Sequence, residues 1–240
     1  MTKPIEHAVI VGGTSGIGLA AAQRLAADGL KVTVAGRNPE RNAAARQTLA
    51  GVAEVLPLDG GDAAQVREFF AALGPFDHLV LALGSGRGAG PFAGLDLNEV
   101  RRGFEEKVWP HLLCAQAALP TIRNTGSITF VAAVSAQMAA PGTAGLAAAN
   151  GALSVVAPIL AAELRPLRVN AVSPGVVDTA WWDFLGEAQR KDTFANFAGR
   201  TPVGRIGAPD DIAKAIAFLI ADDFVTGHVL VCDGGLRLAA

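Results

Sequence analysis

The sequence has no tyrosine, only two cysteines and no surplus of basic residues. Its 240 residues carry 20 Lys and Arg against 22 Asp and Glu, a formal net charge of −2. Such a chain lacks the excess positive charge that attracts nucleic acid or anionic lipid, so we expect neither partner. Cys114 and Cys232 stand far apart, with no CxxC or Cys/His cluster. We therefore expect no metal site, and two buried thiols in the reducing cytoplasm.

Targeting segments and long apolar runs are also missing. The first residues, from Met1 to Glu6, contain no apolar stretch of the kind found in signal peptides. The Ala-rich stretch over residues 144–162 is interrupted by Asn150 and two glycines. The sequence therefore predicts a cytoplasmic protein without a membrane span.

What the chain does have is a 51% share of hydrophobic residues together with 28 glycines. That share supports a large core, and no Ser/Pro-rich or charged run divides residues 1–240 into two domains. Short β-rich runs, several almost continuously apolar, alternate with longer helical segments. This pattern predicts an α/β fold of the Rossmann type, a doubly wound parallel sheet of about seven strands with helices on both faces. The expected strands are residues 7–11, 31–35, 53–58, 78–82, 127–131, 168–171 and 228–231, and the expected helices are residues 16–28, 39–49, 63–73, 98–122, 142–163 and 209–221.

Residues 178–200 fit this alternation poorly. They are rich in aromatic side chains: Trp181, Trp182, Phe184, Phe194 and Phe197. Two interpretations stay open, a lid or loop that contacts a substrate and a surface that packs against another subunit.

The first predicted strand runs into a glycine-rich turn, and a helix follows. Glycines at this spacing let the backbone approach a pyrophosphate, and the helix amino terminus offers unpaired N–H groups and a favourable dipole. The strand–turn–helix context makes a dinucleotide site the prediction. The residues expected to contact the pyrophosphate region are Gly12, Thr14, Ser15, Gly16, Ile17 and Gly18.

The second predicted strand ends at Gly36-Arg37-Asn38. An acidic residue here would bind the ribose 2′-hydroxyl of NAD and repel a 2′-phosphate. Gly36 is uncharged, and the Arg37 guanidinium can bind a phosphate with paired hydrogen bonds, with Ser15 and Asn38 as further donors. The sequence therefore predicts NADP(H) as the cofactor.

The glycine turn, the Gly36-Arg37 pair and several later segments resemble the short-chain dehydrogenase/reductase family over nearly the whole chain. The later segments are Leu58-Asp59, residues 168–175, Thr179 and residues 225–235. The resemblance implies that Asp59 contacts the adenine and that Gly84 lies where the cofactor passes. It also implies a homodimer or homotetramer, built from the helices expected at 98–122 and 142–163 and from the last strand. The remaining residues that it assigns to the cofactor are Pro174, Gly175, Val177 and Thr179.

Members of that family use Asn, Ser, Tyr and Lys for catalysis. The resemblance places Ala133 at the serine position, Leu146 at the tyrosine position, Asn150 at the lysine position and Lys107 at the asparagine position. Because the chain contains no tyrosine, no shift of the alignment restores the usual acid.

Lys107 and Asn150 are the catalytic residues that we predict in their place. An ammonium at 107 could polarise a carbonyl, and the amide at 150 could bind a ribose hydroxyl, so both also count as cofactor contacts. The alternatives for Lys107 are a solvated lysine and an ion-pair partner of Glu105 or Glu106. Further potential proton donors are Ser135, Thr143 and His111.

Two hypotheses of function follow, and a third, a lyase or isomerase that uses the same pocket, has no feature of the sequence in its favour. In the first, the protein transfers hydride between NADPH and an apolar carbonyl or alcohol substrate by a non-standard proton path. Loss of a positioned acid lowers the rate by about 10²–10⁴, but cofactor and substrate are still held side by side, so redox chemistry is weakened and not excluded. In the second, it is a catalytically inactive NADP(H)-binding sensor or scaffold. The expected pocket wall is mostly apolar and favours a hydrophobic small-molecule substrate: Ala132, Ala133, Met138, Leu146, Trp181 and Trp182.

Overall fold

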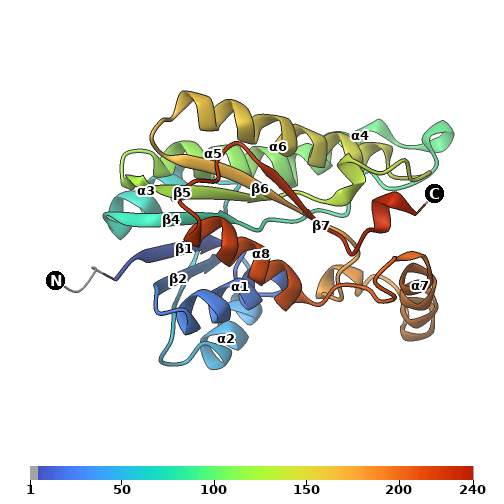
Figure 1. The fold of residues 1–240 in the computed structure, drawn as a ribbon, viewed down its shortest axis with the longest axis horizontal. Helices are drawn as coiled ribbons and strands as arrows, with labels where there is room; N and C mark the ends of the chain where they lie inside the picture. Colours follow the sequence, from blue (N-terminus) through green and yellow to red (C-terminus); the bar gives the residue numbers. More distant parts are fainter. Residues whose placement is uncertain (1–4, 240) are drawn as a thin grey trace.

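The computed structural model describes residues 5–239, which form a seven-stranded sheet of order β3-β2-β1-β4-β5-β6-β7 (Figure 1). All neighbouring strands are parallel. The expected doubly wound sheet is therefore confirmed, and the strand order reverses between β1 and β4, where such sheets bind their ligands. The strands are β1 His7–Val11, β2 Lys31–Gly36, β3 Glu54–Pro57, β4 Phe76–Leu81, β5 Ile122–Val131, β6 Arg168–Pro174 and β7 Val229–Cys232.

Helices cover both faces of this sheet (Figure 1). One layer holds α1 Gly16–Ala27, α2 Pro39–Thr48 and α8 Pro209–Ala221, and the other holds α3 Ala63–Leu73, α4 Leu97–Gly103, α5 Trp109–Ala118 and α6 Ala144–Glu163. Along β1, Ala8 and Ile10 enter the core beneath α1 and α8, while Val9 and Val11 enter the core beneath α3, α5 and α6. A strand buried on both faces has to be continuously apolar, as this one is.

The single helix expected over residues 98–122 is wrong. After α4 the chain forms a π-helical turn, Phe104–Val108, and only then α5. Pro110 accounts for the interruption, because it has no N–H for the carbonyl four residues earlier and its ring crowds that carbonyl. The helical segment ends by residue 119, and β5 begins at Ile122, five residues earlier than expected.

Residues 178–200 are more regular than expected. They contain a short 3₁₀ turn, Ala180–Trp182, and the helix α7, Glu187–Arg200. Helix α7 stands apart from the sheet, on the side of the molecule where the carboxyl terminus lies (Figure 1). No residue of α7 is buried. Its half-buried positions, 190, 193, 194, 197 and 198, recur at helical spacing, but only Phe194 and Phe197 among them are large and apolar, so the apolar periodicity by which a sequence predicts helices is weak.

Helix α6 is long and apolar enough to cross a membrane by length and composition, with a mean hydropathy of 1.7. The interruptions by Asn150 and two glycines did not remove that property, contrary to expectation. In the structure α6 packs on the sheet, where Leu153 and Ala157 are fully buried. The core helix of a soluble protein has the same composition, and the absence of a membrane span stays a prediction.

Candidate active site

All sixteen predicted cofactor residues line one cleft of about 820 Å³. It opens at the carboxyl ends of the strands, beside the β1/β4 reversal. The cleft is lined at one end by the glycine turn and elsewhere by Lys107, Asn150, Ala133 and Leu146. The sheet topology therefore brings together segments that lie more than 160 residues apart in the sequence.

The glycine turn packs closely against the end of β4 and against the start of α1. Gly12 has a φ of +82°, and a Cβ there would lie 2.6 Å from the Ala82 carbonyl oxygen. A Cβ on Gly18 would overlap the Gly12 carbonyl oxygen. Ser15 is the N-cap of α1 and makes no side-chain capping hydrogen bond, so the first N–H groups of the helix remain available. These features fit a dinucleotide pyrophosphate.

Two arginines reach the cleft beyond β2. Arg37 was predicted, whereas Arg41, in the first turn of α2, was missed; within residues 5–239 neither guanidinium forms an ion pair. Asn38 serves mainly as the N-cap of α2, because its Oδ1 accepts a hydrogen bond from the Arg41 N–H at 2.8 Å. At Gly36 a Cβ would lie 2.6 Å from Thr14 Oγ1, so a larger residue there would have to displace Thr14.

The remaining cofactor residues line the cleft on loops after β3, β4 and β6. Asp59 Oδ1 accepts a hydrogen bond from the Gly61 N–H at 3.0 Å and thereby shapes the loop after β3. Thr179 approaches the glycine turn, since a Cβ on Gly16 would lie 3.2 Å from its Cγ2. A Cβ on Gly175 would lie 2.8 Å from Asp233 Cα, which explains why glycine stands there.

Among residues 5–239 Lys107 is neither solvated nor paired with a carboxylate, so both alternatives for it are wrong. Its side chain leaves the π-helical turn toward the end of β5, is only 7% exposed, and donates to the Ala132 carbonyl oxygen at 3.4 Å. Burial lowers the pKa of Lys107 to about 8. A lysine with this pKa can hold or release a proton near neutral pH.

His111 lies behind Lys107 and does not line the cleft. It is fully buried, with Nδ1 2.6 Å from the Lys107 carbonyl oxygen and Nε2 3.0 Å from the Leu81 carbonyl oxygen. Burial, followed by the nearby Lys107 charge, lowers the pKa of His111 to about 3. A neutral imidazole has one N–H, and both acceptors here are backbone carbonyls, so His111 is not a substrate proton donor.

The Asn150 side-chain amide is hydrogen-bonded to neighbouring groups of the protein. Its Nδ2 donates to Ser135 Oγ at 3.1 Å and to the Leu146 carbonyl oxygen at 2.9 Å, while its buried Oδ1 has no partner within residues 5–239. Ser135 accepts that bond and donates to no acceptor in the described chain, so its hydroxyl proton is free. Thr143 has committed its proton to the Ala140 carbonyl oxygen at 2.7 Å.

A cluster of aromatic rings closes one side of the cleft. Trp181, Trp182 and Phe197 line it, and Trp181 packs edge-on against Trp182 with ring centres 4.7 Å apart. Arg190 of α7 ties this segment together through Asp178 at 2.6 Å and Asp183 at 2.8 Å.

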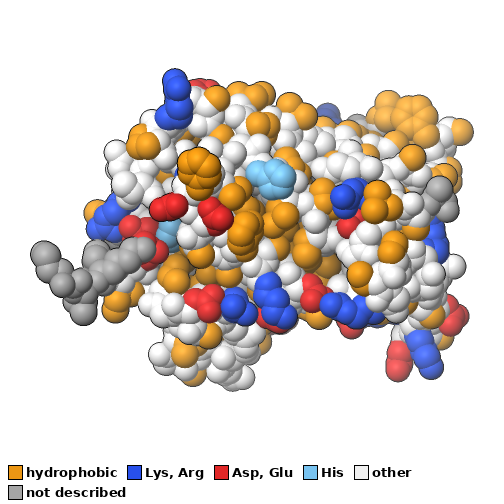
Figure 2. All heavy atoms as spheres, in the orientation of Figure 1, with side chains coloured by type: hydrophobic (Ala, Val, Ile, Leu, Met, Phe, Trp, Pro, Cys, Tyr) orange, Lys and Arg blue, Asp and Glu red, His pale blue; other side chains and the backbone are white. Residues whose placement is uncertain are grey.

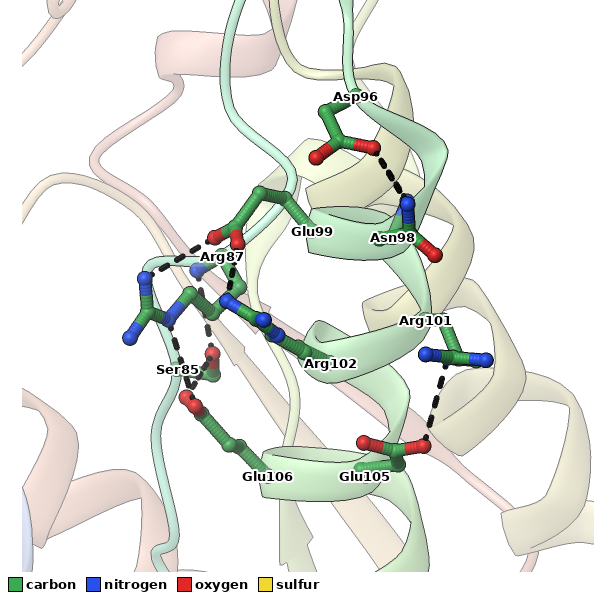
Figure 3. Close-up of polar contacts among 9 residues, drawn as sticks. All are labelled: Ser85, Arg87, Asp96, Asn98, Glu99, Arg101, Arg102, Glu105 and Glu106. Carbon is green, nitrogen blue, oxygen red and sulfur yellow. Dashed lines mark hydrogen bonds and ion pairs between the residues drawn. The ribbon is translucent and has the colours of Figure 1, made fainter.

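The two glutamates before Lys107 have other partners. Glu105 forms an ion pair with Arg101 at 3.7 Å. Glu106 accepts hydrogen bonds from Ser85 Oγ at 2.8 Å and Arg87 Nε at 3.3 Å (Figure 3). Sequence reasoning missed Ser85 and Arg87, because no motif marks a loop residue that meets a helix about twenty residues later.

The sheet order, the glycine turn at the start of α1 and the cleft at the strand ends define a Rossmann-type nucleotide-binding protein. The family model described as enoyl-(acyl carrier protein) reductase matches residues 11–237, and the chain belongs to this short-chain dehydrogenase/reductase family of oxidoreductases. The expected family is therefore confirmed.

Relatives of known sequence or structure extend over almost the whole chain. An uncharacterised oxidoreductase of Methylorubrum extorquens is 36% identical, covering 96% of this chain and 97% of its own. A 3-oxoacyl-[acyl-carrier-protein] reductase of Rattus norvegicus is 30% identical, covering 96% and 98%. A crystal structure of a small-chain dehydrogenase in complex with NADPH superposes with a TM-score of 0.83 at 29% identity, covering 98% and 99%.

Proposed function

We propose that the protein is an NADP(H)-dependent oxidoreductase that interconverts an apolar carbonyl compound and its alcohol, with Lys107 in place of the usual tyrosine acid. The observation that carries this proposal is a buried lysine side chain on the wall of the cleft that holds every predicted cofactor residue. Bound NADPH would supply the hydride.

The cofactor preference is supported by charge. Arg37 and Arg41 border the cleft without ion-pair partners among residues 5–239, and no acidic residue ends β2. Two guanidiniums suit a 2′-phosphate and gain less from a 2′-hydroxyl. The similar structure that contains NADPH agrees with this preference.

The proton path follows from the four potential donors. Thr143 and His111 are committed to backbone carbonyls, which leaves Lys107 and Ser135. The Lys107 ammonium donates a proton from Nζ to the carbonyl oxygen as the alcohol forms, and the resulting amine takes a proton from solvent. Ser135 donates a hydrogen bond to the same oxygen, while Asn150 Nδ2 holds Ser135 Oγ in place.

The experiment is NADPH oxidation at 340 nm over a panel of apolar aldehydes and ketones, with wild type and Lys107→Met. We expect turnover in wild type and a loss of about 10²-fold or more in the variant, with NADPH affinity retained. Dinucleotide binding without turnover of any carbonyl would support the sensor or scaffold instead. Equal rates for the two proteins would remove Lys107 from the mechanism.

The segment 178–200 and the assembly belong to the same proposal. Three of the five aromatic residues in 178–200 line the cleft, namely Trp181, Trp182 and Phe197, which supports a lid rather than a subunit contact. Trp109 on α5 and Val155 and Ile159 on α6 are exposed, and β7 is a half-buried edge strand. Figure 2 shows apolar side chains gathered near the middle of the face that carries β7, between charges of both signs. A homodimer or homotetramer would cover these surfaces, and sedimentation tests it.

A further inference from the structure

One corner of the cleft has no part in the proton path described above. There the loop after β4 meets the π-helical turn, and Figure 3 shows Ser85 and Arg87 pointing toward Glu106. Ser85 also accepts a hydrogen bond through its carbonyl oxygen from Trp181 Nε1 at 3.4 Å. Ser85 therefore joins a carboxylate and an indole ring, both of which line the cleft.

Trp181 presents a fixed flat surface in this corner. Its ring packs edge-on against Trp182 and against Phe184, whose centre is 5.4 Å away, and its N–H is held by Ser85. It lies close to the loop after β4, because a Cβ on Gly86 would lie 3.6 Å from Trp181 Cζ2. An indole held in this way offers a planar ligand both stacking and edge contacts without first losing side-chain freedom.

Glu106 keeps acceptor capacity that the protein does not use. A carboxylate has about four acceptor positions, and within residues 5–239 its hydrogen bonds come from Ser85 and Arg87. The side chain is 33% exposed. Arg87 offsets its charge, and Lys107 adds a further positive group to the same cleft. The corner therefore favours a neutral hydroxyl donor over a cationic ligand.

We infer that Trp181 and Glu106 form a substrate subsite for planar aromatic carbonyl compounds that carry a hydroxyl group. The ring lies against the indole, and the hydroxyl donates to the Glu106 carboxylate. The assignment of this corner as a substrate subsite rests on the proposed function, but ligand binding there can be measured without turnover.

The experiment is calorimetric titration of the protein saturated with NADP⁺ with three probes of similar shape: 6-hydroxy-1-tetralone, 6-methoxy-1-tetralone and 1-tetralone. We expect the hydroxy compound to bind about tenfold or more tighter than the methoxy compound, since a hydrogen bond to a charged acceptor is at stake. Glu106→Gln should reduce that ratio several-fold. Glu105→Gln, a neighbouring carboxylate on the same turn, is the matched control and should leave the ratio unchanged.

Trp181→Leu should weaken all three tetralones about equally and leave 1-decalone, the saturated counterpart, nearly unaffected. Arg87→Met removes the ion-pair partner of Glu106 and leaves the Glu106 carboxylate in place, so this variant should preserve the preference for the hydroxy compound. Equal affinity for the hydroxy and methoxy probes would overturn the assignment. So would a change in NADP⁺ affinity in Glu106→Gln, because the carboxylate would then lie on the dinucleotide. Selective binding without turnover of any carbonyl would refute the proposed function and leave the subsite standing.

Discussion

Replacing Lys107 by methionine should make the protein more stable at neutral pH. The ammonium is buried, and its one protein acceptor within residues 5–239 is the Ala132 carbonyl oxygen at 3.4 Å. Burial of a charge with so few partners costs free energy in the folded state only. Methionine has a similar length and an apolar end, so the variant removes the charge without opening a large cavity.

The magnitude follows from the lowered pKa. Lys107 has a pKa of about 8 in the folded protein against 10.5 as its ordinary value. Because the folded pKa is the lower one, the cost is full at pH values below 8 and disappears as the pH rises past 10.5. At 1.36 kcal/mol per pKa unit, removal of the charge should raise the free energy of unfolding by about 3 kcal/mol at pH 7 and by about 1 kcal/mol at pH 9.5.

The assay is urea unfolding of wild type and Lys107→Met at pH 7 and pH 9.5, followed by circular dichroism. Lys214→Met is the matched control, since Lys214 is exposed and pairs with Asp210 at 2.6 Å. We expect that control to change stability by no more than about 1 kcal/mol at either pH. A Lys107→Met variant that is no more stable than wild type, or whose gain is the same at both pH values, would refute the burial argument.

Further predictions concern the same cleft. Carbonyl reduction should fall about tenfold per pH unit above pH 8, as Lys107 loses its proton, and stay level below pH 8; a pH–rate profile measures this, and a profile still flat at pH 9.5 would contradict it. Arg37→Ser and Arg41→Ser should each weaken NADPH binding about tenfold by calorimetry while NADH binding stays within about twofold, and an equal loss for both cofactors would argue against 2′-phosphate recognition. Gly18→Ala should abolish dinucleotide binding because its Cβ overlaps backbone, whereas Gly199→Ala, with open space around it in α7, should bind normally and gain about 0.5–1 kcal/mol of stability.

The cofactor half of the cleft could be predicted from the sequence because its determinants are local. A strand, a glycine turn and a helix follow one another within about twenty residues, and the position of Gly36 at the end of β2 follows from the same alternation. Arg41 was missed because a helix-start arginine has no signature that separates it from a solvated one. Its approach to the cleft depends on how α2 turns back over β2.

The catalytic half could not be predicted because it depends on contacts between distant segments. The sequence shows that residue 107 is a lysine, but the burial of the Lys107 side chain depends on the π-helical turn before Pro110 and on the end of β5. The amide of Asn150 is likewise committed to Ser135, fifteen residues earlier. Hydrogen bonds of this kind leave no periodic pattern in a sequence.

The buried lysine also separates the two hypotheses of function. A sensor or scaffold that only binds NADP(H) needs the glycine turn and the arginines beside β2, and all of these lie on exposed or backbone-lined parts of the cleft. Such a protein gains nothing from an ammonium that is 7% exposed and that we expect to destabilise the fold at neutral pH. A reductase gains a proton donor whose pKa lies near the working pH, which is the range in which general acids are most effective. The burial of Lys107 on the cleft wall, together with its expected stability cost, is therefore the strongest physical reason to expect turnover.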